Sequence, residues 1–254
     1  MDQSGGDSPS ARLQVRIVPQ GVESLIALAG QGEQIAERGI QAEDLAVAVR
    51  DDGLGVIALE NEDKTAPGSL MFFDARTTSA TVLGSVGVGS LPDMVTITPD
   101  GKQALVANEG EPADDFSTDP EGSVGIVDLP AEVAAPSTAD VRTADFRDFE
   151  DGGSKTLPEG VRVFGPNPNG DLPVSRNLEP EYITVAGGKA YATLQEANAI
   201  AVVDIAAGEV ERIMPLGFKD YGKAGNGLDP SDRDPKDAPM VNIATYPGLK
   251  GAYM

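Results

Sequence analysis

Two segments of this chain repeat the same order of residues, and that repeat constrains the fold more than any other feature. The first runs from Leu91 to Glu109 and the second from Glu179 to Glu196. Each opens with proline and an acid, alternates apolar residues up to a turn at a Gly-Lys pair, and returns as a second apolar run. Each then leads into a short apolar strand that ends in aspartate, at Asp128 and at Asp204. A strand-turn-strand-loop-strand unit of this kind is typical of a β-propeller blade.

An earlier unit with the same pattern begins near Asp44 and ends at Asp74. Short strands bounded by Gly and Pro, with almost no amphipathic helix, predict an all-β fold: a β-propeller of short antiparallel four-stranded blades, about three to four of them present. A closed ring needs at least about four blades. The predicted organisation is an N-terminal segment without a legible pattern at 1–43 and a partial β-propeller domain at 44–254, with units at 44–90, 91–129 and 178–217, an insertion at 130–177 and a polar loop at 218–240.

The amino-acid composition limits which partners and which reactive groups this chain can use. Forty-one acidic residues against 19 basic ones give a net charge of -22, which disfavours nucleic acid and anionic membrane surfaces as partners and favours cations or basic surfaces. The same acidity also fits a protein that stays soluble in salt. The chain has no cysteine and no histidine, so thiolate and imidazole chemistry are excluded and the hypothesis of an enzyme loses weight. No apolar run is long enough for a membrane-spanning helix, and the first residues lack the pattern of an export signal.

The most charged loop follows the second strand of the middle unit and is a candidate metal site. Calcium takes about six to eight oxygen ligands, which several carboxylates on one loop can supply, although the spacing is not that of an EF-hand. The candidate metal ligands are Glu109, Glu111, Asp114, Asp115, Asp119 and Glu121. The alternative interpretation is a solvated loop whose charges cap turns.

Two pairs of polar residues occupy corresponding places in the two repeats: Asp93 with Glu181, and Asn108 with Gln195. Positions that recur in a propeller can line its central channel, where they either bind a ligand or bond to neighbouring blades. The candidate ligand-binding residues are Asp93, Asn108, Glu109, Glu181, Gln195 and Glu196. The aspartates that end the third strands have a local role in this interpretation, accepting backbone N–H groups to begin a turn.

A second acidic cluster lies in the predicted polar loop. It consists of Asn226, Asp229, Asp232, Asp234 and Asp237, with Pro230 and Pro235 between them. Proline, glycine and like charges oppose packing, which favours a loosely held linker, with a calcium site as the alternative.

Several motifs resemble those of a known family. The residues from Tyr191 to Thr193, from Asn198 to Asp204 and from Gly208 to Val210 are similar to the repeats of YVTN-type surface-layer propellers. Over about residues 44–254 the chain resembles the choice-of-anchor I family, on Leu91 to Glu111, Asp114 to Ser123, Asn177 to Tyr182, Leu216 to Asp220 and Gly225 to Asp229. The resemblance implies a seven-bladed bacterial propeller that is extracellular, periplasmic or held at the cell surface. Because family members carry an export signal, further blades and a C-terminal anchor, we expect this chain to be a partial one.

These observations support one leading hypothesis and two rivals. The leading hypothesis is a non-enzymatic, extracytoplasmic β-propeller used for binding or surface display and stabilised by calcium, with a cell-envelope component, a protein or a small molecule as its ligand. One rival is a metal-dependent hydrolase that acts on phosphate esters, as some alkaline-phosphatase-like relatives are named. The other is a protein-interaction scaffold. No phosphatase motif or phosphate-binding loop is present in the sequence.

Overall fold

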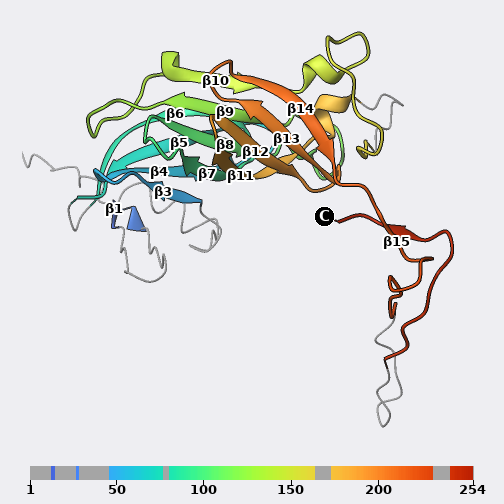
Figure 1. The fold of residues 1–254 in the computed structure, drawn as a ribbon. Helices are drawn as coiled ribbons and strands as arrows, with labels where there is room; N and C mark the ends of the chain where they lie inside the picture. Colours follow the sequence, from blue (N-terminus) through green and yellow to red (C-terminus); the bar gives the residue numbers. More distant parts are fainter. Residues whose placement is uncertain are drawn as a thin grey trace, which may run out of the picture.

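The structure is a computed structural model that describes residues 13–14, 27–28, 46–76, 80–163, 173–230 and 241–253. Three four-stranded antiparallel sheets follow one another along the chain, each a simple up-and-down meander (Figure 1). The described ranges contain no α-helix, only 3-10 turns at Thr138–Asp140, Arg147–Phe149 and Val174–Arg176. The predicted all-β class and the four-stranded antiparallel unit are therefore confirmed.

The first sheet comprises β3 (Val47–Val49), β4 (Leu54–Leu59), β5 (Pro67–Asp74) and β6 (Thr81–Ser90). The second comprises β7 (Pro92–Ile97), β8 (Gln103–Asn108), β9 (Ser123–Asp128) and β10 (Val141–Ala144). The third comprises β11 (Pro180–Ala186), β12 (Lys189–Leu194), β13 (Ala199–Asp204) and β14 (Glu209–Pro215). Two short pairs complete the described strands: β1 (Leu13–Gln14) with β2 (Ala27–Leu28), and β15 (Lys219–Asp220) with β16 (Lys250–Gly251).

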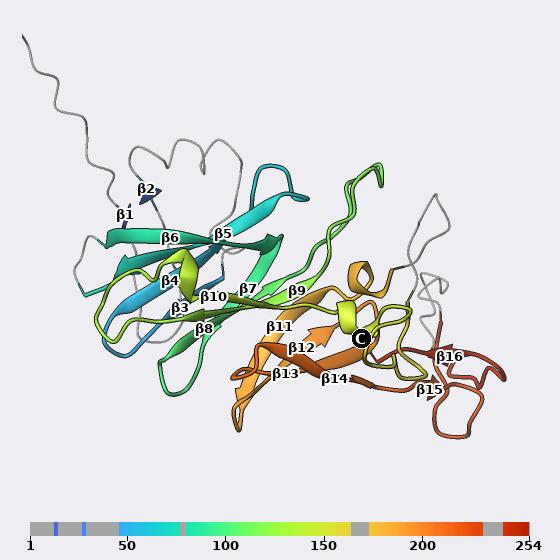
Figure 2. The same cartoon turned by 90° about the horizontal axis from the view of Figure 1, so that it is seen from above.

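The second sheet is buried on both faces because its strands alternate two apolar sets. In β8, Ala104 and Val106 lie in the core shared with the first sheet, whereas Leu105 and Ala107 lie in the core shared with the third. The inner strands make the closest contacts between sheets, β3 and β4 with β7, and β7 and β8 with β11. The three sheets are thus stacked in chain order (Figure 2).

The segment 130–177, which the sequence pattern marks as an insertion, also builds part of the second sheet. It contains β10, which pairs with β9 from Val141 opposite Val127 to Ala144 opposite Val124. Beyond β10, Phe146 and Phe149 are buried in the core between the second and third sheets. The second sheet therefore takes its outer strand from this segment. The sequence pattern does not reveal this strand, because the strand is short and follows a turn instead of another alternating run.

Close backbone contact joins the residues before β9 to the residues at the start of the third sheet. A Cβ atom at Gly122 would lie 2.1 Å from the carbonyl oxygen of Leu178 and 2.8 Å from Cδ of Pro180. The Gly122 N–H also donates a 3.0 Å hydrogen bond to the carbonyl of Ser175. Only glycine fits here, and the contact places the residues before β9 beside the start of β11.

Two of the three strand-ending aspartates have the expected local role. Asp74 Oδ1 accepts the backbone N–H of Arg76, and Asp204 Oδ1 accepts that of Ala207. Asp128 differs, since its Oδ1 accepts side-chain bonds from Gln103 and Arg142. It therefore joins strands within the second sheet.

Candidate functional site: an acidic junction between two sheets

Carboxylates from two sheets gather where the inner strands of the second and third sheets meet. Asp93 lies at the start of β7 and Glu109 directly follows β8, while Glu179 and Glu181 flank the first residue of β11. Glu196 follows the end of β12. We call these five residues the acidic junction. β7 and β8 both contact β11, so the strand ends that carry these acids are neighbours.

Irregular strand pairing positions two of these acids. The pairing of β7 with β8 shifts register between Pro92 and Met94, and the pairing of β11 with β12 shifts between Pro180 and Ile183. Asp93 and Glu181 lie within these shifts, where a bulge turns a side chain out of the regular alternation. The repeat thus places an acid on an equivalent irregularity in both sheets.

The acids interact electrostatically across the two sheets. Burial, and then the charges of Glu111, Asp93 and other carboxylates, raises the pKa of Glu109 to about 8. Burial and the charge of Glu196 raise the pKa values of Glu179 and Glu181 to about 7 in each case. Burial also raises the pKa of Asp93. Near neutral pH the junction therefore holds protons that isolated carboxyls would have lost.

No basic side chain neutralises the junction within the described part of the chain. None of its five carboxylates forms an ion pair there, and Glu181 instead shares a hydrogen bond with Glu196. Glu181 is also only 9% exposed. An accumulation of partly buried, like-charged groups is electrostatically unfavourable, and a bound cation would relieve it.

The acids predicted as calcium ligands on the loop after β8 do not gather at one point. Glu111 and Asp114 both pair with Lys64, at 3.3 and 3.1 Å, and Glu121 pairs with Arg147 at 2.8 Å. Asp115 accepts the backbone N–H of Ser117, and Asp119 has a buried Oδ1 without a hydrogen-bond partner. Among the residues that the structure describes, no three acidic side chains are close enough to hold one metal ion. Glu109 alone of this set belongs to the junction.

Asn108 and Gln195 are not equivalent in the strand register. Pro92 lies opposite Asn108, and the corresponding Pro180 lies opposite Leu194, so Gln195 corresponds to Glu109. Asn108 is fully buried, packs close to Gly89 of β6 and donates a 3.1 Å hydrogen bond to the Ser123 hydroxyl. It therefore lies between the first and second sheets. The predicted equivalence of Asn108 and Gln195 is therefore wrong by one residue, because the similar pairs Asn108-Glu109 and Gln195-Glu196 lie at different places relative to the strand ends.

The sequence pattern alone did not identify Glu179, although its pKa is raised as far as that of Glu181. The sequence does mark this residue, since Glu179 and Glu181 lie on either side of the proline that begins β11.

In the second acidic cluster, Asn226 donates to the carbonyl of Asp220, and Asp229 accepts the backbone N–H of Asn242. The other members of that cluster, Asp232, Asp234 and Asp237, lie outside the described residues.

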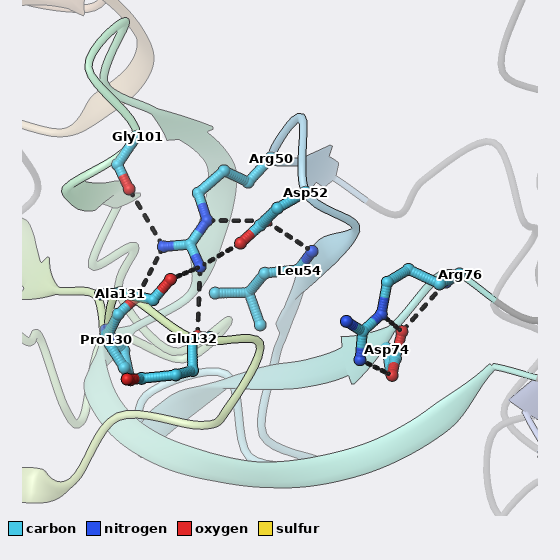
Figure 3. A network of polar contacts seen from close by, with 9 residues as sticks. All are labelled: Arg50, Asp52, Leu54, Asp74, Arg76, Gly101, Pro130, Ala131 and Glu132. Carbon is cyan, nitrogen blue, oxygen red and sulfur yellow. Dashed lines mark hydrogen bonds and ion pairs between the residues drawn. The ribbon is translucent and has the colours of Figure 1, made fainter.

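A hollow lies at the opposite end of the second sheet, between the turns of the first two sheets. Its lining includes the β3–β4 turn, the β7–β8 turn and the residues after β9. Arg50 extends from the first of these turns and donates to the carbonyls of Gly101, Pro130, Ala131 and Glu132 while pairing with Asp52 (Figure 3). Its donors are thus already used to hold the two sheets together.

Three consecutive antiparallel sheets with an acidic junction define an all-β protein built from repeated four-stranded units. The chain belongs to the choice-of-anchor I domain family, whose model matches residues 19–254. Membership of that family indicates a surface-associated protein, at the cell surface or outside the cell.

Other comparisons add little to this assignment. A search of curated proteins finds no match. A solved structure of a nidogen/laminin complex is similar over 67% of this chain and 46% of that chain, with 13% sequence identity and a TM-score of 0.37. The matched region is thus less than half of the other chain. Within the described residues, no helix has the length and apolarity needed to cross a membrane.

Proposed function

We propose that this protein is a non-enzymatic, surface-associated binding module and that its acidic junction binds calcium. The observation that carries the proposal is the junction itself: partly buried acids from two sheets, without a basic partner among the described residues. A divalent cation would neutralise them. It would also join the second sheet to the third.

Oxygen chemistry supports calcium as the cation. Calcium accepts six to eight oxygen ligands in flexible geometry, including water and backbone carbonyls as well as carboxylates. Since no three described acids lie within range of a common ion, two carboxylates with water would have to form the first ligand set. Such a site would bind weakly, with a dissociation constant of about 10⁻⁴ to 10⁻³ M, as in extracellular calcium modules.

Calorimetric titration with calcium and thermal unfolding with and without a chelator test the proposal. We expect millimolar binding and a rise in the unfolding temperature when calcium is added, because the ion binds only the folded state. Substituting both Glu109→Gln and Glu181→Gln should abolish the heat and the shift. The matched control is Glu209→Gln, at an exposed position on β14, which should change neither.

A result of no binding heat and no chelator effect on the natural chain would remove calcium from the proposal. Binding that survives the double substitution but disappears when Asp114 and Asp115 are replaced by asparagine would instead assign the ion to the loop after β8.

A further inference from the structure

One peptide bond in the loop after β8 joins an unusual aspartate, Asp119, to Pro120. The loop comprises residues 109–122 and projects beyond the second sheet (Figure 2). Asp119 is half-buried, and its Oδ1 is fully buried without a hydrogen-bond partner among the described residues. A buried oxygen that lacks a partner costs free energy, so its presence in a folded protein calls for an explanation.

Other aspartates in the turns of this chain use their carboxyl oxygens to accept backbone N–H groups. Asp115 accepts the N–H of Ser117 in the same loop. Asp229, which also precedes a proline, accepts the N–H of Asn242 at 2.7 Å. The Oδ1 atom of Asp119 makes no such bond within the described ranges, so it is available to react.

An aspartate followed by proline carries the groups needed to cut its own backbone. Carboxylates act as nucleophiles in proteins, and an aspartate carboxyl group can reach its own backbone carbonyl carbon because the attack closes a five-membered ring. Proline supplies a nitrogen that has no N–H and so takes no part in backbone hydrogen bonding. Asp119 is therefore a candidate nucleophile, and Pro120 supplies the leaving nitrogen.

The loop holds both sides of this bond in place. At its neck, a Cβ atom on Gly110 would lie 2.8 Å from the carbonyl carbon and oxygen of Glu121. Glu121 also pairs with Nε of Arg147 at 2.8 Å. On the other side of the bond, the Ala113 N–H donates a 2.8 Å hydrogen bond to the carbonyl of Thr118. Fixed neighbours on both sides limit the motion of the reacting groups, which favours reaction within the chain.

The tip of the loop is strained, and the bond lies outside the sheet. Phe116 has a φ of 57°, in the left-handed region that bulky side chains rarely adopt. The paired strands end at Asn108 and resume at Ser123, so a cut between them removes no hydrogen bond of the sheet. Cleavage would thus release strain and leave β8 paired with β9.

We propose that the protein cleaves its own chain between Asp119 and Pro120. The carboxyl oxygen of Asp119 forms a bond to the backbone carbonyl carbon of the same residue, the C–N bond to Pro120 breaks, and the carboxyl proton passes to the proline nitrogen. The cyclic anhydride left at Asp119 takes up one water molecule and opens to two carboxyl groups. The products are residues 1–119 and 120–254, and water is the only co-reactant.

Cleavage would also create a positive charge near the acidic junction. The new N-terminus at Pro120 is a secondary amine, which is largely protonated near neutral pH. Gly122, two residues further on, lies against the carbonyl of Leu178, the neighbour of Glu179. The reaction thus supplies a cation to a group of acids that has no basic partner among the described residues, and it does so independently of calcium.

Incubation of the purified full chain in mildly acidic, calcium-free buffer, followed by intact-mass measurement, tests the proposal. We expect two fragments whose masses sum to that of the chain plus one water, the second beginning at Pro120. The rate should not depend on protein concentration, because the reaction takes place within one molecule. Guanidinium chloride should slow the cleavage severalfold at the same pH, because unfolding releases the groups that the loop positions.

Four variants separate the roles of the residues. Asp119→Asn should abolish the cleavage, and Asp119→Glu should slow it severalfold, because the attack would then close a six-membered ring. Arg147→Ala, which releases Glu121, should slow it as well. The matched control is Asp229→Asn at the other Asp–Pro bond of the described residues, which should leave the rate unchanged. Thermal unfolding of each variant checks that it is folded.

Several results would overturn the proposal. One is an intact mass that stays constant over weeks, and another is a rate that rises with protein concentration, which would point to a contaminating protease. Equal cleavage after Asp119 and after Asp229, or equal rates in the folded and the denatured chain, would also do so. Cleavage would then reflect only the general acid lability of Asp–Pro bonds and not this fold.

Discussion

Arg142 in β10 donates a 3.0 Å hydrogen bond from Nη1 to the carbonyl oxygen of Ile205, which directly follows β13 of the next sheet. The same guanidinium pairs with Asp128 of its own sheet at 3.3 Å. One side chain thus fixes the outer edge of the second sheet to the turn of the third.

Replacing this side chain should loosen the contact between the two sheets. We expect Arg142→Ala to lower the free energy of unfolding by about 1 kcal/mol, less than a buried charged hydrogen bond contributes, because the side chain is 33% exposed. Urea denaturation measures the loss. Arg76→Ala, which removes only an exposed pair within one turn, should cost clearly less, and equal losses in the two variants would contradict a role between sheets.

The acidic junction should make the protein less stable as the pH rises from about 5 to 8. Glu109, Glu179 and Glu181 have folded-state pKa values of about 8, 7 and 7, above the usual value for glutamate, so the folded state binds more protons in this window. For each extra proton that the folded state binds, the free energy of unfolding falls by about 1.4 kcal/mol for every unit by which the pH rises. Carboxyls with lowered pKa values, such as Asp74 at about 2, stay ionised throughout.

Urea denaturation in calcium-free buffer between pH 5 and pH 8 measures this dependence. Glu109→Gln should flatten it, because glutamine cannot ionise, while Glu209→Gln should leave the slope unchanged. A free energy of unfolding that increases from pH 5 to pH 8 would show that the pKa values of the junction carboxyls are not raised in the folded state.

Calcium binding should depend on pH in the opposite direction. The ion binds ionised carboxylates, so protons retained by the junction below about pH 7 compete with it. We expect calorimetric affinity to increase from pH 6 to pH 8 and calcium binding to release protons. An affinity that is constant over this range would place the ion away from Glu109, Glu179 and Glu181.

Gly122 should not tolerate a side chain. Gly122→Ala forces a methyl group against the carbonyl of Leu178, and we expect a loss of about 1 to 3 kcal/mol from this overpacking. The control is Gly87→Ala in β6, where a Cβ atom meets nothing within 4 Å. Thermal unfolding of the two variants should therefore differ, and a neutral Gly122→Ala would mean that the approach of the two segments is looser than described.

The sequence predicted the first three strands of each unit well, because apolar residues alternate along them and turn residues or an aspartate mark where they end. The third strands end at Asp74, Asp128 and Asp204 as expected. The outer strands were less legible. β6 contains three glycines, at 84, 87 and 89, and β10 has four residues within a long connecting segment, so neither shows a clear period of two.

The candidate site was only partly predictable. The repeat pointed to Asp93 and Glu181, and the acids after β8 and β12 pointed to Glu109 and Glu196. It could not show that Glu111, Asp114 and Glu121 have lysine or arginine partners from distant segments. Nor could it show that Gln195 corresponds to Glu109 and not to Asn108, because the strand pairing, and not the similarity of the residues, fixes the register.

The meander arrangement has a consequence for the order of folding. Within each sheet, every strand pairs with the strand next to it in the chain, so these contacts close short loops at low entropic cost. Contacts between sheets span much longer separations, such as the 82 residues between Arg50 and Glu132. We therefore expect each meander to form as a local unit during synthesis, with sheet docking as the later step.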